Sequence, residues 1–140
     1  MKRYTISLIS RIRERSSKFI MQKLSENGIT GIVSSHGDII GTLFEIEKCT
    51  MTDLAKKIQR TKATLTVLVD KLVAGGLVVR EKSTDDSRVT YIKLTPKCMK
   101  IRPVFEKISE ELNAITHEGL SEEEAEMLET LLGRVNKNFE

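Results

Sequence analysis

The sequence predicts a single, mainly α-helical domain, residues 1–140, that carries a small β-hairpin. Apolar residues recur every three or four positions through most of the chain, which is the spacing of one face of an α-helix. Two runs rich in β-branched residues, LVVR and VTYIKL, flank a polar stretch and favour a hairpin. Two short helices precede that hairpin. This arrangement is a winged helix-turn-helix, with about six helices in all.

A long amphipathic helix is predicted over residues 5–26. Isoleucine, leucine and phenylalanine fall on one side of it, arginines fill the other, and Asn27 and Gly28 end it. Residues 36–47 have helical apolar spacing and predict a buried central helix. His36, in its first turn, is expected to be partly exposed or hydrogen-bonded, with no catalytic role.

The helix-turn-helix is predicted to begin at Thr50, which is placed to cap its first helix three residues before Asp53. Ala55 is small enough for two helices to cross closely. The second helix covers residues 61–74 and ends at a pair of glycines, a common helix terminus. On a helical wheel its inward side consists of Leu65, Leu68, Val69 and Leu72.

The outward side of this second helix lacks the Glu, Lys and Gln that solvated helices usually carry. It consists of Ala63, Thr64, Thr66, Val67 and Lys71. Small hydroxyl and methyl groups suit contact with base edges, including the thymine methyl group. Arg60 and Lys62 add donors for guanine or phosphate beside a helix start at Thr61, which itself favours phosphate. The alternative is a threonine-rich helix without a DNA-binding role.

The tip of the predicted hairpin, EKSTDDSR, is turn-rich and charged. Aspartates are unexpected on a loop that faces DNA, because phosphates repel them, unless they position a neighbouring arginine. Asp86 lies two residues before Arg88 and can hold the guanidinium group in one orientation. An ordered arginine suits a narrow minor groove, where the negative potential is strongest. The alternative is an ordinary surface ion pair, which contributes at most about 1 kcal/mol.

The remaining helices are predicted from capping signals. Thr95 and Pro96 begin one helix, which Pro103 is expected to bend, and Ser121 with Glu124 forms a capping box ahead of the last. The apolar stripes of the first and last helices exceed what one small core can cover. They predict a homodimer in which these helices pack together.

The charge is divided unevenly along the chain. Residues 48–102 contain 13 Lys and Arg against 5 Asp and Glu, whereas residues 103–140 contain 3 against 10. A basic helix-turn-helix segment is expected to face a polyanion such as double-stranded DNA, because lysine and arginine bound to phosphates release counterions. The competing function is a protein-interaction module on which the basic charge is incidental.

Other classes of function find no support in the sequence. The two cysteines, Cys49 and Cys98, show no CxxC spacing and predict buried small hydrophobic residues rather than a metal site or disulfide. No paired histidines, nucleophile with a nearby base or glycine-rich phosphate loop indicates an enzyme or a cofactor. No apolar run approaches the roughly 20 residues of a membrane span, and the N-terminus is unlike a signal peptide, so a cytoplasmic protein is expected.

Three segments, TMTDLAKKI, TLTVLVDKLVAGGLVVR and DDSRVTYIKLTPK, occur in an order and spacing that resembles the MarR family of bacterial transcriptional regulators. The resemblance covers essentially the whole chain. It implies a winged-helix homodimer, with a DNA-binding region at 30–95 and dimerisation helices at 1–27 and 96–140. Such dimers bind pseudo-palindromic DNA and usually repress, and many release DNA when a small ligand binds.

Carried over to this chain, the resemblance places the recognition helix on residues 61–74 and the Asp-x-Arg motif of the wing on Asp86, Ser87 and Arg88. Two positions depart from the family pattern. Ser87 stands where a basic residue is common, and Cys98 stands where glycine is common. Some members sense oxidants through a cysteine in the first helix, but no cysteine precedes Cys49 here, which argues against that mechanism.

Overall fold

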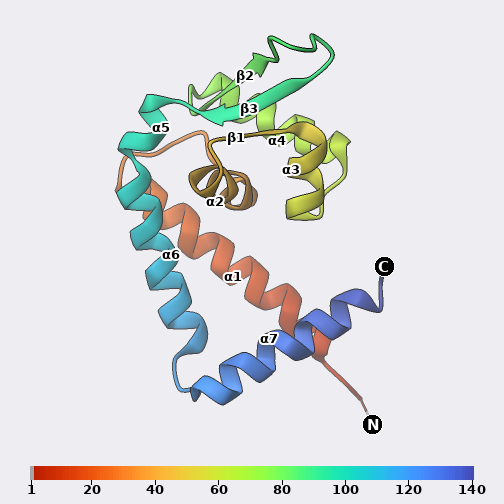
Figure 1. The fold of residues 1–140 in the computed structure, drawn as a ribbon. Helices are drawn as coiled ribbons and strands as arrows, with labels where there is room; N and C mark the ends of the chain where they lie inside the picture. The colour runs from red at the N-terminus through yellow and green to blue at the C-terminus, as the bar shows by residue number, and fades with distance from the viewer. Residues whose placement is uncertain (1) are drawn as a thin grey trace.

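The computed structural model describes residues 2–140, drawn in Figure 1. Over these residues the chain is mainly helical and contains one small sheet. The elements, in order, are α1 (Thr5–Glu26), η1 (Ser34–His36), α2 (Gly37–Glu45), β1 (Lys48–Thr50), α3 (Met51–Ile58), α4 (Lys62–Ala74), β2 (Val78–Lys82), β3 (Thr90–Leu94), α5 (Pro96–Lys100), α6 (Arg102–His117) and α7 (Glu122–Lys137).

The sheet is antiparallel with the strand order β1-β3-β2. Val78 pairs with Leu94 in the hairpin, and Cys49 pairs with Ile92 on the other side of β3. The hairpin prediction is confirmed, but the third strand, β1, was not predicted. It has three residues and no alternating pattern of its own, and only its pairing with β3 makes it a strand.

The described chain contains seven α-helices, one more than the sequence predicted, because the segment after the sheet is broken rather than bent. Thr95 caps α5 by accepting a hydrogen bond from the Cys98 backbone, as its sequence position suggested. That helix ends at Lys100, and α6 begins at Arg102 with Pro103 in its first turn. A proline is tolerated in the first turn of a helix but breaks a continuous one, which explains the restart.

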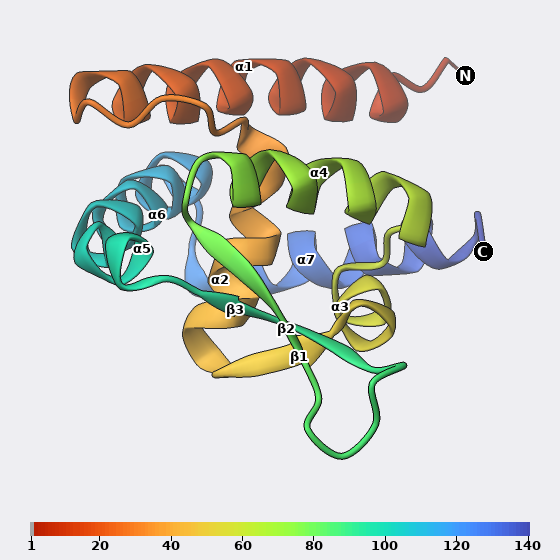
Figure 2. The same cartoon turned by 90° about the horizontal axis from the view of Figure 1, so that it is seen from above.

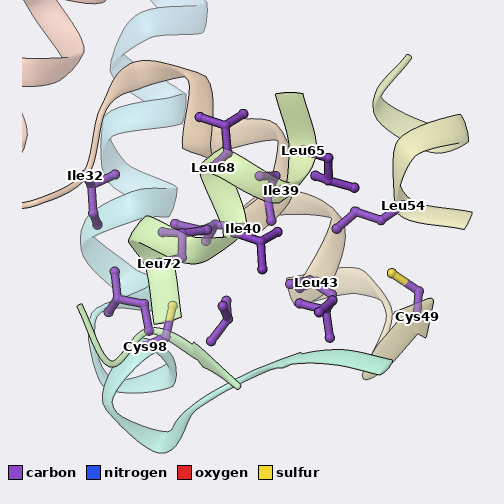
Figure 3. Close-up of a cluster of buried hydrophobic side chains, with 14 of the residues drawn as sticks. Ile32, Ile39, Ile40, Leu43, Cys49, Leu54, Leu65, Leu68, Leu72 and Cys98 are labelled. Carbon is purple, nitrogen blue, oxygen red and sulfur yellow. The ribbon is translucent and has the colours of Figure 1, made fainter. Parts of the chain in front are cut away.

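The core lies between α2, the helix-turn-helix and the sheet. Leucines from α4 lie beside the isoleucines of α2 (Figure 3). Completely or almost completely buried side chains include Leu24, Ile39, Ile40, Leu54, Leu65, Leu72, Val78 and Ile92. The position of α4 is therefore fixed by the apolar face predicted for it, since burying each such leucine contributes roughly 1.5–3 kcal/mol.

Three long helices extend from this winged unit. Figure 1 shows α1 and α6 extending from it and α7 passing across the first half of α1 in that view, while Figure 2 shows that α1 and α7 lie apart in depth. Apolar side chains on these helices remain exposed in the single chain, among them Ile6, Leu8, Ile9, Ile12, Ile115, Met127, Leu128, Leu131 and Leu132. The expected surplus of apolar surface on the terminal helices is thus present.

His36 is fully buried rather than partly exposed, and it is hydrogen-bonded as expected. Its Nδ1 accepts a hydrogen bond of 2.9 Å from the Val33 backbone, so the ring is neutral there. Burial lowers the pKa of His36; the Leu68 carbonyl opposes that shift and the charge of Lys71 adds to it. The helix predicted over residues 36–47 is observed as α2, which begins at Gly37, and His36 is the last residue of the preceding 3₁₀ turn η1.

The buried histidine predicts a pH dependence of stability. Because the folded pKa of His36 lies below that of the unfolded chain, its contribution is complete above about pH 6.5 and declines as the pH falls below that value. Thermal unfolding between about pH 5 and pH 8 should show this decline. His36→Asn should flatten it, whereas His117→Asn, at the other histidine, should not. Equal slopes for the wild type and His36→Asn would contradict the prediction.

Candidate nucleic-acid interface

Helix α4, the predicted recognition helix, is positioned by caps at both ends. Gln59, in the left-handed conformation (φ 53°), ends α3 and turns the chain sharply. Thr61 then caps α4, because its hydroxyl oxygen accepts a hydrogen bond of 3.2 Å from the Thr64 backbone. At the other end Gly76 adopts φ 73°, which a residue with a side chain rarely does. The predicted boundaries of this helix are confirmed to within one residue.

The two faces of α4 agree with the helical wheel. Its inward leucines and Val69 are buried. The residues predicted to contact DNA from this segment are exposed, apart from the half-buried Arg60; they are Thr61, Lys62, Ala63, Thr64, Thr66, Val67 and Lys71. An outward surface of small side chains is thus framed by lysines near both ends.

The threonine hydroxyls of α4 are partly engaged within the helix. Thr66 Oγ1 donates a hydrogen bond of 2.8 Å to the Lys62 carbonyl. Thr61 Oγ1 and Thr64 Oγ1 are 3.1 Å apart and hydrogen-bonded to one another. These bonds fix the side chains before any partner binds, and they restrict which of the hydroxyls can donate outward.

The hairpin tip holds Arg88 in the predicted way. Its Nε and one terminal nitrogen donate to the two carboxylate oxygens of Asp86, both at 3.0 Å, and its backbone nitrogen donates to the same carboxylate. These bonds lower the pKa of Asp86. The Arg88 side chain is nevertheless 88% exposed. Figures 1 and 2 show the loop projecting from the body of the molecule, so a fixed guanidinium group stands at its end.

Sequence reasoning missed a second aspartate–arginine pair, which joins α4 to the wing. Asp70 on the exposed face of α4 forms a hydrogen-bonded ion pair with Arg80 on β2. The sequence did hold a signal for this pair. Asp70 is the acidic residue on an otherwise apolar and basic face, and a carboxylate there needs a cationic partner if the face is to approach phosphates. Ten residues separate the pair in sequence, so only the fold shows that they meet.

Other candidate chemistry is not assembled in the described chain. Between residues 2 and 140 no three His, Cys, Asp or Glu side chains are grouped to hold a metal ion. Cys49 and Cys98 are buried free thiols, as expected, and burial raises the pKa of Cys98 to about 11, which keeps it protonated and unreactive. Among residues 2–140 no helix has the length and apolar character to span a bilayer.

The pair α3–α4, followed by the β2–β3 hairpin and closed by the short strand β1, defines a winged helix-turn-helix protein. Comparison with known proteins agrees. The family model described as "MarR family" matches residues 34–90, which hold the helix-turn-helix, β2 and the tip of the wing. The HTH-type transcriptional regulator FarR of Neisseria gonorrhoeae is 34% identical over 100 residues, which cover 71% of this chain and 68% of that protein. The chain belongs to the MarR family of transcriptional regulators.

Solved structures show the same fold over nearly the full length. The MepR–DNA complex of S. aureus superposes with a TM-score of 0.85 at 27% identity and covers 99% of both chains. A mutant MarR from E. coli, complexed with operator DNA, gives a TM-score of 0.79 at 23% identity over 92% of this chain and 91% of that one. At the latter identity the likeness concerns the fold.

Proposed function

We propose that this regulator binds double-stranded DNA in a sequence-specific way and represses transcription as a homodimer in the cytoplasm, without catalytic activity. The observation that carries the proposal is the exposed, small-residue face of α4 beside a fixed arginine at the wing tip. An α-helix fits the major groove, and an arginine fits the minor groove. The complexes of MepR and MarR with DNA support the proposal by analogy.

Each proposed contact residue has a separate task. Thr64, Thr66, Ala63 and Val67 face the base edges, with Lys62 and Lys71 at either end of this group. Arg60 and the capped start of α4 at Thr61 bind phosphate, because a helix N-terminus presents free N–H groups. Arg88 enters the minor groove, and Asp86 positions it without touching DNA.

The exposed apolar faces of the terminal helices support a homodimer. A groove of about 780 Å³ lies between α1, α6 and α7, and its lining is almost entirely apolar. Leu8, Ile9 and Ile12 contribute from α1, and Leu128 and Leu132 contribute from α7. Two copies related by a twofold axis would present two α4 helices to successive major grooves, roughly 34 Å apart, and so recognise a pseudo-palindromic operator.

A small effector would have a place to bind between the dimerisation helices and the winged unit. A cavity of about 230 Å³ there is lined by Ile20 and Leu24 of α1 and by Phe105, Ile108 and Leu112 of α6. Residues 32–34 and 37–38 close its other side. We propose that an apolar ligand bound here changes the separation of the two α4 helices and releases DNA.

Selection of bound sites from random duplex DNA, followed by affinity measurements at several salt concentrations, tests this function. The proposal predicts a consensus with twofold symmetry and a steep loss of affinity with added salt. The competing function, a protein-interaction module built on the same fold, predicts neither. Failure to enrich any sequence, together with a shallow salt dependence, would reject the proposed function.

Lys62→Ala is expected to change the selected consensus, because a lysine at the start of a recognition helix can donate to guanine. The predicted loss is about 1–3 kcal/mol at the affected base pair. Lys107→Ala, an exposed lysine on α6, is the matched control and should leave the consensus unchanged. An unchanged consensus for Lys62→Ala, with a uniform loss of affinity, would assign Lys62 to phosphate instead.

A further inference from the structure

We propose that the centre of α4 reads thymine through its C5-methyl group, with Val67 as the specificity-determining residue. The proposal rests on the DNA-binding function above and names the chemistry of the base that this surface recognises. It assigns Ala63 and the methyl group of Thr66 as the neighbours of Val67 in the contact.

Val67 is the exposed large hydrophobic residue of α4, with 56% of its surface accessible. It lies on the side of the helix opposite Leu65, Leu68 and Leu72, all of which are buried. Ala63 lies one turn earlier on the same ridge, because an α-helix has about 3.6 residues per turn. Ala63 and Val67 thus place methyl groups side by side on the outward face of α4.

Thr66 adds to this surface in a restricted way. Its hydroxyl donates a hydrogen bond of 2.8 Å to the Lys62 carbonyl. The Thr66 side chain can therefore contact a base only through its methyl group and a lone pair of its hydroxyl oxygen. A lone pair accepts from the amino group of adenine or of cytosine, but only the A·T pair also carries a methyl group in the major groove. An A·T pair therefore satisfies both Thr66 and Val67.

The acidic residue on this face does not favour guanine either. The carboxylate of Asp70, one turn after Thr66, is bound by Arg80 of β2. From residue 63 to residue 70 the exposed side of α4 has no arginine, asparagine or glutamine that could bond a base with two hydrogen bonds. The side-chain donors that could reach guanine are Lys62 and Thr64 near the start of α4 and Lys71 towards its end, since the Thr64 hydroxyl accepts from Thr61 and keeps its own hydrogen. The centre at Thr66 and Val67 is left to methyl recognition.

The simplest competing arrangement places Val67 against deoxyribose, which would be the same for every base. Replacement of thymine by deoxyuridine separates the two, because it removes the methyl group and leaves base pairing intact. Each thymine of the selected operator is replaced in turn, in both half-sites together, and affinity is measured by fluorescence anisotropy at fixed salt. Loss of one methyl contact should weaken binding about fourfold per half-site.

Val67→Ala supplies the decisive comparison. It removes two methyl groups from an exposed position and improves helix propensity, so the fold should be retained. The variant should bind thymine and deoxyuridine operators equally at the position where the wild type discriminates. Ala74→Ser, an exposed substitution at the last residue of α4, should preserve the discrimination.

Three results would overturn the proposal, and they are distinguishable. Indifference of the wild type to deoxyuridine at every thymine rejects methyl recognition but leaves the proposed DNA-binding function intact. Discrimination that persists unchanged in Val67→Ala rejects the assignment to Val67. Failure to select any operator rejects the DNA-binding function and the methyl recognition with it.

Discussion

Replacement of Arg88 by alanine is expected to weaken operator binding by roughly thirtyfold or more, since each of the two subunits loses one charged contact worth about 1–3 kcal/mol. The loss should be larger when A·T-rich DNA flanks the operator, because a narrow minor groove concentrates negative potential. Anisotropy titrations at one salt concentration, with A·T-rich and G·C-rich flanks, measure both effects. Lys82→Ala, an exposed cation in the same hairpin, is the control and should show no dependence on the flanks.

A variant of Asp86 tests whether the orientation of Arg88, and not only its charge, contributes to DNA affinity. Asp86 forms three hydrogen bonds with Arg88, and without them the guanidinium group would be free to rotate. Asp86→Ala should therefore lower affinity although it removes a negative charge from a DNA-facing loop. A gain in affinity would mean that repulsion of phosphate outweighs orientation. Equal losses on every flank for Arg88→Ala would show that the wing reads no groove width.

The features predicted from sequence are those determined by neighbouring residues. The capping box of Ser121 and Glu124 is an example: the Ser121 hydroxyl accepts from the Glu124 backbone at 3.1 Å, and the Glu124 carboxylate accepts from the Ser121 backbone at 2.9 Å. The Asp86–Arg88 pair and the two faces of α4 also depend on spacing alone. Each can be evaluated from a few adjacent side chains.

The missed features depend on chain segments that meet only in the fold. Strand β1 exists because Cys49 pairs with Ile92, 43 positions later in the chain. The complete burial of His36 depends on α4 packing against η1, and Asp70 finds Arg80 across a helix-to-strand contact. Patterns of neighbouring residues contain no information about contacts between segments that are far apart in the sequence. The roles of the α4 and wing residues in DNA contact also involve a second molecule, and they remain predictions.

Hydrogen bonds and an ion pair join α4 to its neighbours β2 and α5. Thr95 Oγ1 donates to the Gly76 carbonyl at 2.6 Å, and Lys97 Nζ donates to the Gly75 carbonyl at 3.0 Å. These bonds tie the C-terminal end of α4 to the start of α5, while Arg80 ties its middle to β2. Because α5 leads directly into α6, a movement of α6 would carry α4 and the wing together.

The proposed dimer is expected to supply most of the operator affinity, because two linked subunits bind two half-sites together. Leu128→Glu combined with Leu132→Glu places two charges in the apolar groove between α1, α6 and α7. Arg13 and Arg15 also line this groove, but burial of two carboxylates among its leucines and isoleucines remains unfavourable, so the variant should be monomeric. A monomer binds one half-site and loses the effective concentration that linkage provides, a loss on the order of 10²–10⁴-fold.

Sedimentation equilibrium would establish the mass, circular dichroism the retained helices, and anisotropy the affinity for full operators and half-operators. Thr130→Glu lies on the opposite side of α7, is exposed, and should remain dimeric with unchanged affinity. The full operator should lose far more affinity than the half-operator does, because only the full operator needs two subunits at a fixed separation. A folded, monomeric double variant with undiminished affinity for the full operator would show that one subunit is sufficient, contrary to the proposed dimer mechanism.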